Sequence, residues 1–138
     1  MKLILEIITP TKVILREEVD EITVTTPNGE ISILPNHVDL LTKIIPGEMV
    51  IKRNNKSELF AITGGFLEIS KNNVSILADH AIRAEDIEVA KAKEAKERAE
   101  QVMKDKEGNR NFVMAEADLR RALIELKVAT KHHQKRTQ

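Results

Sequence analysis

Closely spaced turn signals constrain the first 82 residues of this 138-residue chain more than any other feature. The tightest pair is Pro27-Asn28-Gly29 and Pro35-Asn36, which enclose one short apolar segment. Proline holds φ near the value that a turn needs, and asparagine and glycine accept positive φ, so the chain should reverse at both places. We therefore predict a strand between them, with Ile31 and Ile33 facing a core and Glu30 at the rim.

The same pattern continues up to Ile82. Short runs of Ile, Val, Leu and Thr alternate with turn pairs such as Pro46-Gly47 and Gly64-Gly65, which is typical of strands. We predict strands over residues 3–8, 13–15, 21–25, 31–34, 48–52, 59–62, 66–70 and 74–78. Since no helical run separates them, βαβ units are excluded, and an antiparallel sandwich or flattened barrel is favoured. At Gly64-Gly65 we expect a β-bulge and a close approach between strands rather than a ligand-binding loop.

Helical patterns replace strands after Ile87. No proline follows Ile87, and Gly108 is the only later glycine, so two long helices with one break are predicted. We expect them over residues 84–104 and 112–131, joined by residues 105–111. Each carries an apolar stripe at spacings of three and four, consisting of Ala92, Ala95, Ala99 and Val102 in the first helix and of Ala115, Leu119, Ala122, Leu126 and Ala129 in the second.

Small side chains on both stripes favour an antiparallel hairpin that is only weakly docked. A buried methylene contributes about 0.8 kcal/mol, so an alanine seam stabilises less per turn than a leucine seam. The overall prediction is an α+β protein. An N-terminal antiparallel β-sandwich over residues 1–83 is followed by a mobile, antiparallel α-helical hairpin over residues 84–138.

Composition excludes several classes of function. The chain has no cysteine, which rules out disulfides and thiolate metal sites. Its 22 basic and 22 acidic residues balance, and three Phe are its only aromatic side chains besides histidine, which argues against nucleic-acid binding. No apolar run reaches the ~18 residues of a membrane span, so we expect no direct membrane insertion. Up to Ile82 acidic residues are in excess, and beyond it basic ones, which suggests different partners for the two halves.

An enzymatic alternative rests on Glu30, His37 and Asp39, which are close in sequence and could act as acid and base. No nucleophile elbow, P-loop or metal-ligand spacing accompanies them, so we do not expect an enzyme. His132-His133 is interpreted as part of a basic, frayed tail rather than as a metal site.

Four motifs, in order and spacing, carry a family resemblance. They are Gly29-Glu30-Ile31-Ser32-Ile33-Leu34-Pro35-Asn36-His37 with Leu40-Leu41-Thr42, Gly64-Gly65-Phe66-Leu67-Glu68-Ile69, Asn73-Val74-Ser75-Ile76-Leu77-Ala78, and Ala81-Ile82-Arg83-Ala84-Glu85-Asp86-Ile87. Over nearly its whole length the chain resembles the epsilon subunits of bacterial F-type ATP synthases. Ser32 and Asn36 stand where glycine is usual in that family, and asparagine tolerates the positive φ.

The resemblance implies a non-catalytic rotor subunit of the central stalk in a proton-translocating F-type ATP synthase, held peripherally at the cytoplasmic face of the cell membrane. Its sandwich would bind the gamma subunit and the c-ring. Its hairpin would move between folded and extended forms and restrain ATP hydrolysis, contacting the beta and alpha subunits when extended. The alternative is an ATP-sensing module with little inhibitory role.

Particular residues follow from this resemblance. Glu30 and His37 should form one projecting edge that contacts the c-ring, although a turn residue such as Glu30 can also be merely solvated. A basic face on the second helix should be the inhibitory element, and it consists of Arg120, Arg121, Lys127 and Lys131. Charged helix faces are commonly only solvated, which is the alternative.

Some relatives bind ATP through an Ile/Leu-Asp-x-x-Arg-Ala motif, which matches Ile87-Glu88-Val89-Ala90-Lys91-Ala92 here. Lys91 lacks the planar fork with which arginine grips two acceptors, and the side chain of Glu88 is one methylene longer than that of aspartate. Arg98 and Arg121 match further nucleotide contacts, whereas glutamate replaces a third arginine at position 125. We therefore expect no required cofactor or metal, and weak or absent ATP binding. Glu88 and Lys91 are equally well explained as ordinary solvated helix residues.

Overall fold

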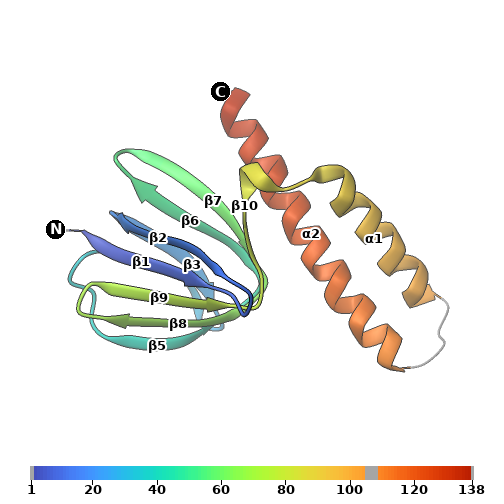
Figure 1. Ribbon diagram of the computed structural model, residues 1–138, viewed down its shortest axis with the longest axis horizontal. Coiled ribbons are helices and arrows are strands. Elements are labelled where there is room, and N and C mark those ends of the chain that lie inside the picture. The colour runs from blue at the N-terminus through green and yellow to red at the C-terminus, as the bar shows by residue number, and fades with distance from the viewer. Residues whose placement is uncertain (1, 105–108, 138) are drawn as a thin grey trace. The chain divides into compact units, whose positions relative to one another are not determined.

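The computed structural model describes residues 2–104 and 109–137 (Figure 1). Contacts between residues divide the chain into two compact units, Met1–Arg83 and Ala84–Gln138. Among the described residues, the regular elements of the first unit are all strands and those of the second are all helices. Of the predicted connection at residues 105–111, positions 105–108 lie outside the described residues.

The first unit is a sandwich of two five-stranded sheets, with the strand orders β2-β1-β9-β8-β5 and β10-β7-β6-β3-β4. This confirms the predicted fold class. The strands are β1 (Leu3–Ile8), β2 (Val13–Val19), β3 (Glu21–Thr26), β4 (Gly29–Ile33), β5 (Leu40–Ile44), β6 (Gly47–Arg53), β7 (Lys56–Ile62), β8 (Gly65–Ser70), β9 (Asn73–Ala78) and β10 (Ala81–Arg83).

All eight predicted strands are present, but two further strands, β5 and β10, were not predicted. β5 lies at the edge of its sheet and pairs only with β8, while the three residues of β10 pair with β7. β2 also extends four residues beyond its predicted end at Leu15, through Arg16, Glu17 and Glu18, whose side chains are at least partly exposed. Pairing with a neighbour creates these strand segments, and local apolar alternation does not reveal them.

One strand pair departs from the predicted antiparallel arrangement, because β1 and β9 run parallel. Between these two strands the chain passes through the opposite sheet, in β3, β4, β6 and β7. That route brings it back in the same direction without a crossover helix. The exclusion of βαβ units is thus confirmed, and the predicted antiparallel sandwich contains this one parallel pair.

The inner faces of the two sheets form the core of the first unit. Leu3, Leu5 and Ile7 alternate along β1 and are fully buried, and Phe60 is the largest side chain in this core. On β4, Ile33 is buried and Ile31 packs against the core, whereas Glu30 is exposed. The predicted inward and outward faces of this strand are therefore confirmed.

Gly64-Gly65 marks a close approach between strands. Both glycines have positive φ, 110° and 143° respectively. A Cβ built on Gly65 would lie 1.9 Å from the backbone oxygen of Leu77 on β9, so only glycine fits here. The register of β8 with β5 and β9 is continuous, so the close approach is confirmed but the predicted bulge is not present in these pairings.

The second unit consists of a short 3₁₀ helix, η1 (Ala84–Asp86), followed by α1 (Val89–Lys104) and α2 (Asn109–Thr137). The predicted start of the first helix at Ala84 was wrong. Ile87 N–H bonds to the Ala84 carbonyl at 3.2 Å and closes a 3₁₀ turn, and the first α-helical bond, from Ala92 N–H to the Glu88 carbonyl, comes only afterwards. α2 runs past its predicted end at 131, since no proline or glycine interrupts it.

α1 and α2 pack along the predicted alanine stripes as an antiparallel pair (Figure 1). The buried members are Ala92, Ala99, Ala115, Ala122 and Ala129. Ala95, Leu119 and Leu126 are half-buried, while Val102 is exposed. The predicted helical hairpin is therefore confirmed, and its two helices meet along a thin seam of small side chains.

Candidate functional site

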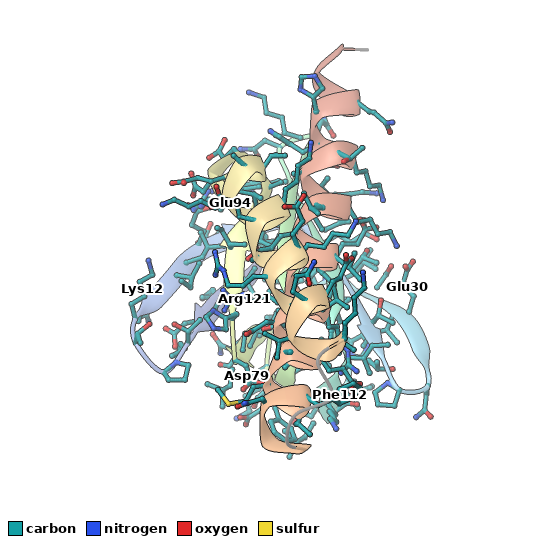
Figure 2. The ribbon with its side chains drawn as sticks, turned by 90° about the vertical axis from the view of Figure 1, so that its right-hand side faces the viewer. Lys12, Glu30, Asp79, Glu94, Phe112 and Arg121 are labelled. Atoms are coloured by element: carbon teal, nitrogen blue, oxygen red, sulfur yellow. The ribbon has the colours of Figure 1, made fainter. Side chains whose placement is uncertain are left out.

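Glu30 lies on the edge strand β4, opposite Thr25 of β3, with its side chain exposed (Figure 2). The preceding turn is held by Thr26, whose hydroxyl donates to the Gly29 carbonyl at 2.8 Å and accepts from the Asn28 N–H at 3.2 Å. Gly29 adopts the positive φ that this turn requires, at 117°. A rigid two-residue turn thus presents the carboxylate at the rim of the sheet.

His37 lies in the loop after β4, which is fastened to the turn between β8 and β9. The Asn36 N–H donates to the Asn72 side-chain oxygen at 2.6 Å, and the Lys71 N–H donates to Asp39 Oδ1 at 3.3 Å. Asn36 has a φ of 69°, which confirms that this asparagine adopts the positive φ expected for it. The His37 loop and the Lys71-Asn72 turn therefore form one continuous surface.

Glu30 is near the beginning of the edge strand β4, and His37 follows the end of this strand. Their joint contact with the c-ring stays a prediction. The contacts described for Asp39 and His37 are with the backbone rather than with Glu30. The Asp39 carboxylate is engaged by the Lys71 N–H, and His37 Nδ1 lies 2.7 Å from the Val38 carbonyl oxygen.

An apolar row on the outer face of the first sheet was missed by sequence reasoning. Phe66 pairs with Leu77, Leu77 with Ile8, and Ile8 with Val13, so the four side chains cross four neighbouring strands. Phe66, Leu77 and Val13 are 56%, 53% and 58% exposed. The signal was present in the strand alternation, where these residues occupy outward positions, but only the register aligns them. Exposed apolar rows of this kind mark interaction sites.

Most of the expected nucleotide residues lie on the surface of the helices. Glu88 and Lys91 are exposed and pair with each other in the first turn of α1, with Oε2 and Nζ 3.0 Å apart. Arg98 is also exposed, whereas Ile87 is buried. Arg121 Nε lies 3.9 Å from the carboxylate of Glu125, so this glutamate offsets the charge of Arg121.

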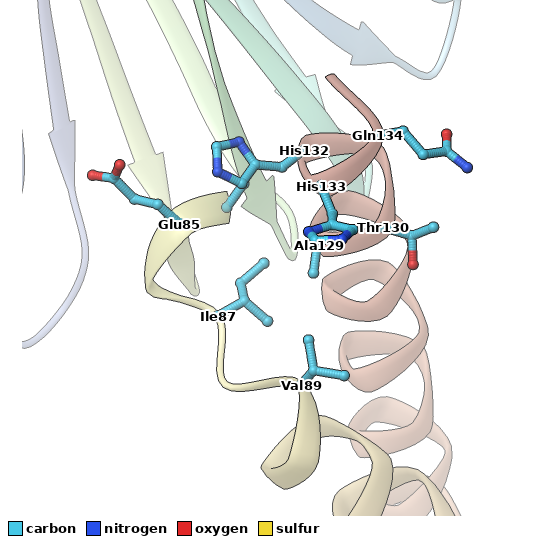
Figure 3. A pocket seen from close by; sticks show the side chains of 9 residues that line it. Glu85, Ile87, Val89, Ala129, Thr130, His132, His133 and Gln134 are labelled. Carbon is cyan, nitrogen blue, oxygen red and sulfur yellow. The ribbon is translucent and has the colours of Figure 1, made fainter. Parts of the chain in front are cut away.

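A cavity of about 540 Å³ lies in the second unit (Figure 3). Of the five expected nucleotide residues, Ile87 alone lines it. His132, which we had assigned to a frayed tail, also lines it from within α2 and is half-buried. That assignment was wrong, because α2 continues as a regular helix to Thr137.

The expected basic face lies on the exposed side of α2. Arg120, Lys127 and Lys131 are spaced by seven and four residues and so share one face, while Arg121 points about 100° away. Arg120 donates to Glu116 at 3.4 Å, one turn earlier, in an exposed pair. An exposed pair of this kind is worth little and can exchange for an intermolecular partner.

Within residues 2–104 and 109–137, no three His, Cys, Asp or Glu side chains are grouped so that they could hold a metal ion. The helices described here include none with the length and apolar character needed to cross a membrane.

Family models match both units of the chain. The model described as the ATP synthase delta/epsilon chain, beta-sandwich domain, matches residues 2–84, and the corresponding long alpha-helix domain matches residues 85–130. An ATP synthase epsilon chain from Herpetosiphon aurantiacus is 43% identical, and the match covers 94% of this chain and 95% of that one. Another from Chloroflexus aggregans is 41% identical, with 100% and 99% covered.

Solved structures agree with the fold. A chain in the Euglena gracilis mitochondrial ATP synthase, described as OSCP/F1/c-ring, superposes with a TM-score of 0.73 at 25% identity, covering 86% of this chain and 76% of that chain. A chain in the central stalk and c-ring of the Tetrahymena thermophila mitochondrial ATP synthase gives a TM-score of 0.60 at 20% identity, with 94% and 97% covered. The second likeness, at this low identity, concerns the fold alone.

Proposed function

Because the chain belongs to the ATP synthase delta/epsilon chain family, we propose that it works as a non-catalytic subunit of the central stalk in an F-type, proton-translocating ATP synthase. Its sandwich binds the gamma subunit and the c-ring. Its helical hairpin restrains ATP hydrolysis by contacting the beta and alpha subunits in an extended form. The protein acts peripherally, at the cytoplasmic face of the cell membrane.

The observation that carries this proposal is the coverage of both units. Relatives named as epsilon chains match the sandwich and the hairpin together, in the same order and over nearly the full length of each chain. A sandwich alone is used by many unrelated proteins, so fold by itself would not support the function. A sandwich followed by this hairpin, at 43% identity, does support it.

We assign the apolar row of Phe66, Leu77, Ile8 and Val13 to the contact with the gamma subunit. A stalk subunit needs a lasting interface, and such interfaces have apolar centres that lose their water. The row lies on a rigid sheet, where binding requires little ordering of side chains. The hairpin's basic face is correspondingly assigned to acidic contacts in the extended form.

Replacing Leu77 by Asp should weaken binding of the full chain to its gamma subunit by roughly tenfold or more, because a charge would be buried at the centre of the interface. Leu77 is 53% exposed, so the sandwich should remain folded. Leu34→Asp is the matched control, since Leu34 is 51% exposed but lies outside the row. Surface plasmon resonance measures the affinity of each variant for the gamma subunit. Equal affinities of Leu77→Asp and Leu34→Asp would contradict the assignment.

For the c-ring contact, we predict that a cysteine replacing Glu30 crosslinks to a cysteine in the polar loop of the c subunit. The chain has no cysteine of its own, so every crosslink would come from the introduced residue. A separate variant with a cysteine in place of His37 tests the loop after β4. Hydrogen bonds join this loop to the Lys71-Asn72 turn. Efficient crosslinking at Lys71 or Asn72, with none at Glu30, would remove Glu30 from the contact.

An ATP-sensing role with little inhibition is the competing function. Titration calorimetry of the full chain with ATP and magnesium should give no binding stronger than about millimolar, because Glu88 already pairs with Lys91, and Glu125 offsets Arg121. A Glu125→Arg variant should bind ATP more tightly, since it removes the repulsion and adds a donor. A micromolar constant for the unmodified chain would favour ATP sensing.

A further inference from the structure

Two opposite charges flank Phe66 on the outer face of the first sheet. Lys43 of β5 pairs with Phe66 across the strands, and Glu68 follows Phe66 by two residues on β8. Their sequence neighbours Ile44 and Leu67 are buried, so the side chains of Lys43, Phe66 and Glu68 point away from the core. All three are exposed. They therefore form one surface group at the β5 end of the apolar row.

Neither charge has a partner in the part of the chain that the structure describes. Over residues 2–104 and 109–137, the side chains of Lys43 and Glu68 form no ion pair and no hydrogen bond, although they are diagonal neighbours on adjacent strands. Glu6 and Arg16, on the outer face of the same sheet, lie 3.6 Å apart and pair with each other. A paired charge has to exchange one partner for another, whereas Lys43 and Glu68 can bind a partner directly.

We propose that Lys43 and Glu68 fix the orientation in which a partner docks on the apolar row, and that this partner carries a carboxylate opposite Lys43 and a lysine or arginine opposite Glu68. The partner is the gamma subunit, an identification that rests on the proposed function of the row. Apolar contact is non-directional, so the row stabilises the complex without selecting one orientation. Two opposite charges at its end do select one, because other orientations lose both ion pairs or bring like charges together.

The position of the two charges decides how they act. β5 is an edge strand of its sheet, so Lys43 lies at the rim of the contact, with Glu68 on the neighbouring strand. Rim charges are partly solvated, so each contributes less than the apolar centre. Their sum is zero, so together they add little to the long-range attraction between the subunits. We therefore expect them to slow dissociation of the correctly docked complex rather than to speed association.

The test exchanges the two charges in the full chain, as Lys43→Glu with Glu68→Lys. Net charge stays the same, but like charges would then face each other at both positions of the docked complex. The affinity for the gamma subunit, measured by surface plasmon resonance, should fall roughly thirtyfold or more, mainly through faster dissociation. Lys43→Gln and Glu68→Gln alone should each weaken binding roughly threefold to tenfold, since each variant loses one ion pair.

The matched control is the same exchange at a charge pair of the second sheet, Glu21→Lys with Lys52→Glu. In the unmodified chain the carboxylate of Glu21 lies 3.4 Å from Lys52 Nζ, so the exchange inverts this pair without changing net charge. Because neither residue lies on the sheet that carries the apolar row, the control should change the affinity for the gamma subunit by less than about twofold. Circular dichroism of each variant distinguishes loss of binding from loss of the sandwich.

Undiminished affinity of the Lys43→Glu, Glu68→Lys chain would overturn the orienting role of these charges. An equal loss of affinity in the control exchange would overturn it too, because the effect would not depend on position. Either result would leave the stalk function standing, provided that the unmodified chain binds the gamma subunit. If the unmodified chain did not bind, the gamma contact of the proposed function would itself fail, and the orienting role with it.

Discussion

An ATP synthase that carries this chain truncated after Ala84 is expected to remain assembled and coupled to proton flow while hydrolysing ATP severalfold faster. Truncation removes α1 and α2 and leaves all strands of the sandwich in place. The alanine seam holds α1 and α2 together only weakly, so the extended form of the hairpin should be accessible. A difference of 1–2 kcal/mol between the two forms changes their ratio by a factor of roughly 5–30. Hydrolysis rates of reconstituted complexes with full-length and truncated chains measure the effect.

Charge-removing substitutions in the full-length chain distinguish the effect of the basic face on hydrolysis from that of the rest of the hairpin. Arg120→Ala with Arg121→Ala should raise hydrolysis partially, since complementary charge would no longer favour the extended form. Lys93→Ala with Lys104→Ala removes the same charge from exposed positions of α1 and is the matched control. Added salt should relieve inhibition by the unmodified chain, because it screens exposed charges at distances beyond about 10 Å at 0.1 M.

Equal hydrolysis rates for full-length and truncated chains, across ATP concentrations, would contradict the inhibitory role. The hairpin would then serve assembly or ATP sensing. If the truncated chain failed to assemble, the rate comparison would not be interpretable, so the amount of chain retained in the purified complex has to be measured alongside.

The largest effect on stability is expected for Gly65→Ala. Its Cβ would lie 1.9 Å from the Leu77 carbonyl oxygen and 2.9 Å from the Ala78 Cα, and both are backbone atoms of the paired strand β9. The strand must shift or break, and a φ of 143° adds strain for any residue with a Cβ. We expect a loss of about 4 kcal/mol, which lowers the melting temperature of the sandwich by roughly 16–32 °C.

Substitutions at two other glycines distinguish the stability cost of the steric clash from that of the backbone strain. Gly29 has a φ of 117° but open space around its Cβ position, so Gly29→Ala should cost only the strain, about 1–2 kcal/mol. Gly47 has neither constraint, and Gly47→Ala should change the free energy of unfolding by less than about 1 kcal/mol. Scanning calorimetry of the three variants gives the order. A Gly65→Ala variant as stable as Gly47→Ala would contradict the prediction, because it would show that β9 can shift without loss of stability.

Local chemistry in the sequence was enough to predict most elements of both units. Pro27, Asn28 and Gly29 specify a turn wherever they occur, because their φ preferences act within a few residues. Helical periodicity likewise predicted the alanine stripes, since residues three and four apart share a face of any helix. The order of these local signals also carried the family resemblance, and the family models confirm it.

Tertiary structure decided what depends on residues far apart in the chain. The parallel pairing of β1 with β9 aligns Ile8 with Leu77, and neither segment alone predicts the apolar row that results. The packing of α2 near Ile87 turns His132 from a tail residue into part of the lining of a cavity. Strand register and helix docking are set by the summed burial of many side chains, so no local pattern of residues encodes them.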